Sequence, residues 1–178
     1  MKRWKRLPYN EAHKIGWRHI MIKKFIDPAG NEQEFGIYDK EGTKMAAVIA
    51  LTEDNKVVVA RQFRQGPELV MDELPGGGVN KEEDPETAAL RELLEETGYV
   101  PKSIEFIGVA RKEAYRNGVH HYYLARGCTQ EHQPNPDEGE FVEPQEITIE
   151  QLIQNAKNGL LTDSVAVLLA YEELQKLI

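Results

Sequence analysis

Glu92, Glu95 and Glu96 are the residues whose type and spacing most clearly permit chemistry. If their segment is a helix, with about 100° between successive residues, the three carboxylates share one face. Like charges one turn apart each cost roughly 0.2–0.5 kcal/mol, so this face is unfavourable without a counter-ion. Hard oxygen ligands on one rigid face suit Mg²⁺ or Mn²⁺, which bridge carboxylates and the phosphates of a substrate. The alternative is a solvated acidic face, and spacing alone leaves both interpretations open.

The segment that carries these glutamates has clear helix boundaries. Asp84 followed by Pro85 predicts the start, because the aspartate can cap free amides and proline has no amide hydrogen to leave unbonded. Gly98 predicts the end. We expect the opposite side of the helix to be anchored by Leu90, Leu93, Leu94 and Thr97. Three glycines at 76–78 precede the helix and predict a loop.

The remaining pattern predicts a mixed α/β (α+β) sandwich. Two segments rich in β-branched and aromatic residues flank a turn at Pro28–Asn31, which predicts an N-terminal β-hairpin arm. We therefore divide the chain into an arm at 1–44 and a second domain at 45–178. Further strands are predicted within 45–64, 103–111, 118–127 and 141–148, and helices near 149–158 and 164–177.

Composition excludes several classes of protein. The chain has 178 residues, 40% of them apolar, which suits one soluble domain with a small extension. No apolar run approaches the roughly 20 residues of a membrane-spanning helix, and no apolar stretch follows the basic start MKRWKR, so neither a membrane nor a secreted protein is expected. The single cysteine, Cys128, fits the cytoplasm. A net charge of −8 argues against binding to a nucleic acid polymer.

Residues 77–99 resemble the Nudix box of the Nudix hydrolases. Gly77, Glu83 and RELLEETGY at 91–99 match its pattern, and only Tyr99 departs from it, at a position where the family usually has an aliphatic residue. The resemblance implies the Nudix fold, a mixed β-sheet sandwiched between helices. It also implies a divalent-metal-dependent pyrophosphohydrolase that cleaves a nucleoside diphosphate linked to another group.

The resemblance also implies roles for individual residues. Arg91 would orient the carboxylates, and Glu83 would tie the glycine segment to the helix by hydrogen bonds. Glu95 would ligate or shape the metal shell. The implied metal ligands are Glu92, Glu95, Glu96 and the carbonyl of Gly76. Cations there would neutralise pyrophosphate oxygens and activate the attacking water.

The segment ARQFRQGPELVMDELPGGG at 60–78 resembles the branch of ADP-ribose and nucleoside diphosphate sugar pyrophosphatases. This branch releases a nucleoside monophosphate and a sugar phosphate. The resemblance implies that Arg64 contacts a phosphate and that Glu73 belongs to the substrate site. N-terminal β arms often build a homodimer in this branch, so we expect a homodimer. A surface arginine is the alternative for Arg64.

A long polar segment before the last strand resembles the loop that supplies the catalytic base in the same branch. Glu138 and Glu140 match its acidic pattern, and we prefer Glu140 as the base. The alternative is a solvated acidic loop.

The substrate is less well defined by the sequence. The ADP-ribose subgroup usually has a proline some fifteen residues after the box, where this chain has Tyr115 and Arg116, which is reminiscent of dinucleoside polyphosphate hydrolases. Both residues could contact a nucleotide or could be ordinary strand-end residues. His120 and His121 are expected to be structural. Alternatives to the sugar pyrophosphatase are a dinucleoside polyphosphate or oxidised nucleotide hydrolase, and a non-catalytic nucleotide-binding sensor.

Overall fold

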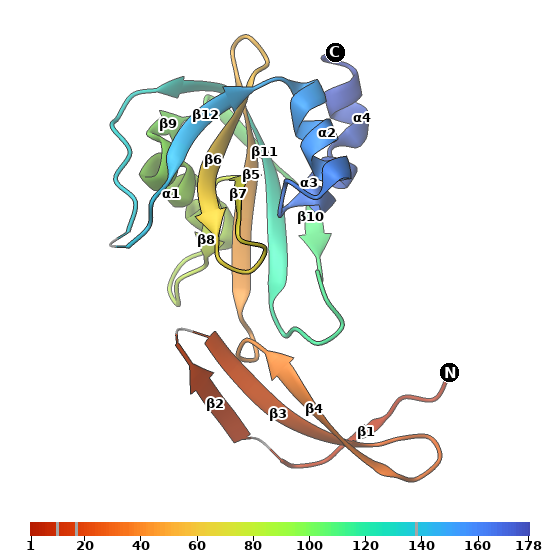
Figure 1. Cartoon of the computed structure of the whole chain (residues 1–178). Helices are drawn as coiled ribbons and strands as arrows, with labels where there is room; N and C mark the ends of the chain where they lie inside the picture. The colour runs from red at the N-terminus through yellow and green to blue at the C-terminus, as the bar shows by residue number, and fades with distance from the viewer. Residues whose placement is uncertain (10, 17, 138) are drawn as a thin grey trace. The chain divides into compact units, whose positions relative to one another are not determined.

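The computed structural model describes residues 1–9, 11–16, 18–137 and 139–178 (Figure 1). The chain forms two compact units. The first comprises Met1–Thr43 together with Arg111–Val119, and the second comprises Lys44–Ala110 together with His120–Ile178. Arg111–Val119, which the sequence assigned to the second domain, therefore packs with the arm.

The first unit is built around a four-stranded antiparallel sheet. Its strands are β1 (Lys5–Arg6), β2 (Glu11–Ile15), β3 (Arg18–Ile26) and β4 (Glu32–Tyr38). β3 pairs with the other three strands, and the β3–β4 hairpin confirms the predicted arm. The side chain of Asp27 accepts hydrogen bonds from the amides of Ala29 (2.8 Å) and Asn31 (2.9 Å), which fixes the turn. β1 and β2 were not predicted, because their residues are largely polar and exposed.

The second unit contains an eight-stranded sheet of order β10-β11-β5-β6-β12, on which β7, β8 and β9 pair with β6, β5 and β11. The strands are β5 (Lys44–Thr52), β6 (Val57–Arg64), β7 (Leu69–Glu73), β8 (Gly76–Gly78), β9 (Tyr99–Val100), β10 (Ser103–Ala110), β11 (Val119–Gln130) and β12 (Glu143–Ile147). The helices are α1 (Pro85–Thr97), α2 (Ile149–Asn158), α3 (Ser164–Leu169) and α4 (Tyr171–Gln175).

Helices cover both faces of this sheet, as the sequence predicted (Figure 1). Successive side chains of β5 point to opposite faces: Val48 packs in the cluster that includes α1, and Ile49 in the cluster that includes α2, α3 and α4. The α+β sandwich is therefore confirmed. Within the described residues, no helix is both long and apolar enough to span a membrane.

Two local predictions were wrong. The glycines at 76–78 form the short strand β8 on β5 rather than a loop. The predicted helix at 164–177 is interrupted at Ala170, and this break lets both α3 and α4 contribute buried residues to one core cluster, among them Ala166 and Leu174.

Candidate active site

Helix α1 begins and ends where the sequence predicted. The Asp84 side chain accepts hydrogen bonds from the amides of Glu86 (3.0 Å) and Thr87 (2.9 Å), and Pro85 is the first helical residue. Gly98 ends the helix in the left-handed conformation, with φ 76°. The caps fix the register of α1 and hence the positions of its glutamates.

The orientation of α1 differs from the prediction. Glu96 is only 5% exposed, whereas Leu94, expected to anchor the helix, is 37% exposed. The buried residues of α1 are Ala88, Ala89, Leu93, Glu96 and Thr97. The reason is strand β8: the amide of Gly76 donates a hydrogen bond to Glu96 Oε2 (3.0 Å), so this carboxylate faces protein rather than solvent.

Two glycines of β8 allow close approach of neighbouring groups. A Cβ on Gly77 would collide with the Glu92 carboxylate, and a Cβ on Gly76 would collide with the backbone of β5. Glycine in a strand commonly marks such a close approach. Gly77 therefore allows the Glu92 carboxylate of α1 to lie against β8, and Gly76 allows β8 to pack closely on β5.

Arg91 joins β8 to α1. Its Nε donates to Glu83 Oε1 and its Nη1 donates to Glu92 Oε1 and Glu95 Oε2, each at 2.9 Å, while its Nη2 donates to the carbonyl of Gly78 (3.0 Å). The Glu83 carboxylate raises the pKa of Arg91, and Arg91 in turn lowers the pKa of Glu83. One guanidinium thus orients three carboxylates.

Glu96 is a buried carboxylate among other acidic side chains. Burial, together with the charges of Glu92, Glu140 and Glu73, raises the pKa of Glu96 to about 8, although its hydrogen bond from Gly76 opposes the shift. Burial also raises the pKa of Glu92, although Arg91 counteracts it. Clustered carboxylates with raised pKa values are those that a nearby cation would stabilise in the ionised form.

These oxygen donors fit a hard divalent cation. Among the residues described, no group of three or more His, Cys, Asp or Glu side chains is arranged to hold a metal ion as it stands. Arg91 lies between Glu92 and Glu95 and bonds both. Mg²⁺ typically takes one or two carboxylates and completes its shell with water and substrate phosphates, so an open arrangement suits it. The metal roles of Gly76, Glu92, Glu95 and Glu96 stay predictions.

Strands β6 and β7 bring Arg64 and Glu73 together. Arg64 Nε donates to Glu73 Oε1 (2.6 Å), and Nη2 of the same guanidinium bonds the other oxygen. The charges of Glu73, Glu96 and Glu140 all raise the pKa of Arg64. Arg64 and Glu73 therefore lie in the same electrostatic environment as the acidic face of α1.

Glu140 lies in the segment between β11 and β12. It is exposed, its amide bonds the carbonyl of Asp137 (3.0 Å), and its charge raises the pKa values of Glu92 and Glu96. Its negative charge therefore acts on two carboxylates of the box. Glu138 lies outside the described residues.

Tyr115 and Arg116 belong to the first unit. Tyr115 is 54% exposed, and its ring stacks on Phe35 with 5.9 Å between ring centroids. Arg116 Nη1 bonds Asp39 Oδ2 (2.9 Å). Their roles in substrate binding stay predictions.

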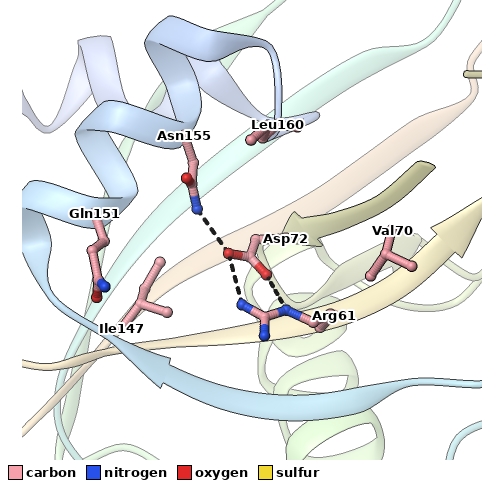
Figure 2. Close-up of a pocket in the computed structure, with 7 residues that line it drawn as sticks. All are labelled: Arg61, Val70, Asp72, Ile147, Gln151, Asn155 and Leu160. Carbon is pink, nitrogen blue, oxygen red and sulfur yellow. Dashed lines mark hydrogen bonds and ion pairs between the residues drawn. The ribbon is translucent and has the colours of Figure 1, made fainter.

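Asp72 and Glu73 point to opposite faces of β7, because they are consecutive strand residues. Glu73 bonds Arg64, whereas Asp72 bonds Arg61 Nε (2.7 Å) and Asn155 of α2 (2.7 Å) beside a cavity of about 390 Å³ (Figure 2). This second ion pair was not predicted from the sequence. The sequence pattern that indicates it is the presence of two arginines on β6, Arg61 and Arg64, and of two consecutive acidic residues on β7.

Tyr99 departs from the family pattern at the end of the box. In the structure its ring is buried and its hydroxyl donates to Glu146 Oε1 of β12 (2.6 Å). An aliphatic side chain at this position could not make that bond.

Comparison with known proteins identifies related sequences and a related fold. The NUDIX domain family matches residues 42–166. The methanol dehydrogenase activator of Bacillus methanolicus is 38% identical over 133 residues, covering 73% of this chain and 72% of that protein. The ADP-ribose pyrophosphatase of Bacillus subtilis (strain 168) is 33% identical over 164 residues, covering 86% and 88%. A solved ADP compounds hydrolase has the same fold, with a TM-score of 0.79 at 17% identity, over 99% of this chain and 96% of that one.

Proposed function

Because this chain belongs to the Nudix family and is a pyrophosphohydrolase, we propose that it cleaves an ADP-ribose-like nucleoside diphosphate sugar. The products would be a nucleoside monophosphate and a sugar phosphate. The observation that carries this proposal is the bonded pair of Arg64 and Glu73, whose charges, like that of Glu140, interact with Glu96. The Bacillus subtilis relative, named an ADP-ribose pyrophosphatase, supports the choice of substrate class.

The substrate phosphates would be bound by Arg64. Its side chain is 43% exposed although Glu73 holds one edge of the guanidinium, so the planar group is oriented and still accessible. A guanidinium fork matches the oxygens of a phosphate and keeps its charge at any working pH. Glu73 therefore acts as the residue that orients Arg64.

Nudix hydrolases use divalent cations, and we propose Mg²⁺ or Mn²⁺ for this one. The cation would be held by Glu92, Glu95, Glu96 and the Gly76 carbonyl, and would neutralise phosphate charge and lower the pKa of the attacking water. Arg91 keeps the carboxylates oriented through its bonds to Glu92 and Glu95.

Glu140 is the proposed general base. It is exposed, and its charge acts on both Glu92 and Glu96, which supports its assignment as the acceptor of the water proton. A base must come within hydrogen-bonding distance of the proton that it accepts. The proton of the attacking water would pass to this carboxylate as the phosphoanhydride bond breaks.

We further propose that the arm at 1–44 supports a homodimer and that the enzyme works in the cytoplasm. The arm forms a sheet of its own, and Cys128 is a buried thiol whose pKa burial raises to about 12, so it suits a reducing compartment. Sedimentation of the full chain should give twice the monomer mass. A monomer at micromolar concentration would contradict the dimer.

A substrate panel tests the proposed activity. Turnover with Mg²⁺ would be measured on ADP-ribose, UDP- and GDP-sugars, diadenosine polyphosphates and oxidised nucleoside triphosphates, with products separated by ion-exchange chromatography. We expect ADP-ribose to give the highest kcat/KM. Preference for a diadenosine polyphosphate or an oxidised nucleotide would replace the assignment, and binding without turnover would indicate a sensor.

A further inference from the structure

Residues 130–135, which precede Glu140, form hydrogen bonds with the C-terminal end of α1. Helix ends leave carbonyls without partners in the helix. The amide of Asn135 donates to the carbonyl of Glu95 (2.7 Å), and the side chain of Gln130 donates to the carbonyl of Thr97 (3.3 Å). The box helix is therefore capped by the polypeptide that leads to the proposed base.

Gly98 allows the segment that follows β11 to pack closely against the end of α1. Its carbonyl accepts hydrogen bonds from the amides of Glu131 (3.0 Å) and His132 (3.1 Å). A Cβ on Gly98 would collide with the carbonyl of His132. The first part of the segment thus lies directly on the end of α1.

Tyr99 contacts the chain on both sides of the segment 131–142. Its backbone pairs with Gln130 at the end of β11, immediately before the segment. Its hydroxyl bonds Glu146 of β12, a few residues after the segment ends. One residue adjacent to the box therefore connects to both strands that flank Glu140.

We propose that Tyr99 is a positioning residue that holds Glu140 at the acidic face of α1. This inference rests on the proposed hydrolysis and on Glu140 as its base. The ring fills the apolar cluster that an aliphatic residue could also fill, but only the hydroxyl reaches β12. Without that bond β12 stays paired with β6, but the hydrogen bond between Glu146 and the end of the box is lost, and Glu140 is less often at the distance that proton transfer requires.

The test replaces only the hydroxyl. Tyr99→Phe should lower kcat for ADP-ribose about tenfold, which corresponds to about 1.4 kcal/mol, with KM changed less than about twofold. Tyr123→Phe is the matched control, because its ring is buried in the same cluster. Glu146→Gln keeps an acceptor oxygen and should stay near the wild-type rate, whereas Glu146→Leu should match Tyr99→Phe. Wild-type turnover in Tyr99→Phe would overturn the proposal.

A double-mutant cycle separates positioning from general packing. In a Glu140→Gln background, Tyr99→Phe should cause no further loss of kcat, because the hydroxyl acts through that carboxylate. An equal loss in both backgrounds would show that Tyr99 merely supports the fold and would overturn the proposal. The two hypotheses fail differently: unchanged turnover in Glu140→Gln refutes the base, whereas a slow Glu140→Gln with a fast Tyr99→Phe refutes only the positioning role.

Hydrogen exchange gives a readout that does not need turnover. In Tyr99→Phe the amide of Glu140, which bonds the carbonyl of Asp137, should exchange faster. The amides of His132 and Asn135, which bond backbone carbonyls of Gly98 and Glu95, should not change. Unchanged exchange at the Glu140 amide would refute the anchoring itself.

Discussion

Replacing Glu96 by glutamine should make the metal-free protein more stable at neutral pH while removing its activity. Glu96 is 5% exposed, and its carboxylate accepts a hydrogen bond from Gly76 that a glutamine oxygen can also accept. The substitution therefore keeps the shape and removes only the ability to ionise. A buried ionised carboxylate without a partner cation is unfavourable, so its removal should stabilise the fold.

The magnitude follows from the pKa of Glu96, which rises from 4.5 to about 8. At a pH between these two values, Glu96 is protonated in the folded protein and ionised in the unfolded chain. The contribution of Glu96 to stability is therefore greatest below pH 4.5 and is lost as the pH rises toward the pKa of the folded state. Between about pH 5 and about pH 8, this loss amounts to about 3 to 4 kcal/mol of unfolding free energy. The glutamine variant should lack this pH-dependent loss of unfolding free energy.

Urea unfolding in EDTA, repeated across this pH range, measures the effect. The wild-type unfolding free energy should fall relative to the variant as pH rises, and Mg²⁺ should restore stability only in the wild type. Glu82→Gln is the control, because it removes the same charge from an exposed position. Parallel pH profiles for wild type and Glu96→Gln would refute the argument that burial of this carboxylate destabilises the metal-free protein.

Other substitutions test separate parts of the site. With Mg²⁺ present, Glu96→Gln should lower turnover by at least about two orders of magnitude with an unchanged circular dichroism spectrum, and normal turnover would remove Glu96 from the metal site. Gly77→Ala should lower both turnover and Mg²⁺ affinity, measured by titration calorimetry, because its Cβ would displace Glu92. Arg64→Lys should raise KM about tenfold in steady-state assays, since an ammonium cannot contact Glu73 and a phosphate with the same planar fork. Asp84→Ala should lower the unfolding free energy in urea by about 1 kcal/mol through the lost cap, with little change in KM.

Local signals in the sequence were sufficient for the boundaries of α1 and for the arm hairpin. The helix ends are determined by Asp84, Pro85 and Gly98, each of which acts on residues only a few positions away in the sequence. Likewise, the turn near Asp27 is made by its immediate neighbours. Such features depend on short-range chemistry, which a sequence displays directly.

The orientation of the acidic face could not be predicted in the same way. The predicted orientation of α1 depended on the assumption that its apolar side chains face the core. Glu96 is instead buried, because glycines about 20 residues earlier in the sequence form β8 beside it. Similarly, the packing of Arg111–Val119 with the arm depends on contacts across the chain. The residues of the box were identified by pattern, whereas their environment depends on tertiary pairing.

The two ion pairs of β6 and β7 also have a consequence for folding. Arg61 and Asp72 meet on the face of α2, and Arg64 and Glu73 meet on the opposite face. If β7 shifted by one residue along β6, each acid would move to the wrong face and both arginines would lose their partners. Misregistered pairing is therefore penalised on both sides of the sheet at once, which favours the one alignment that places Glu73 beside the acidic helix.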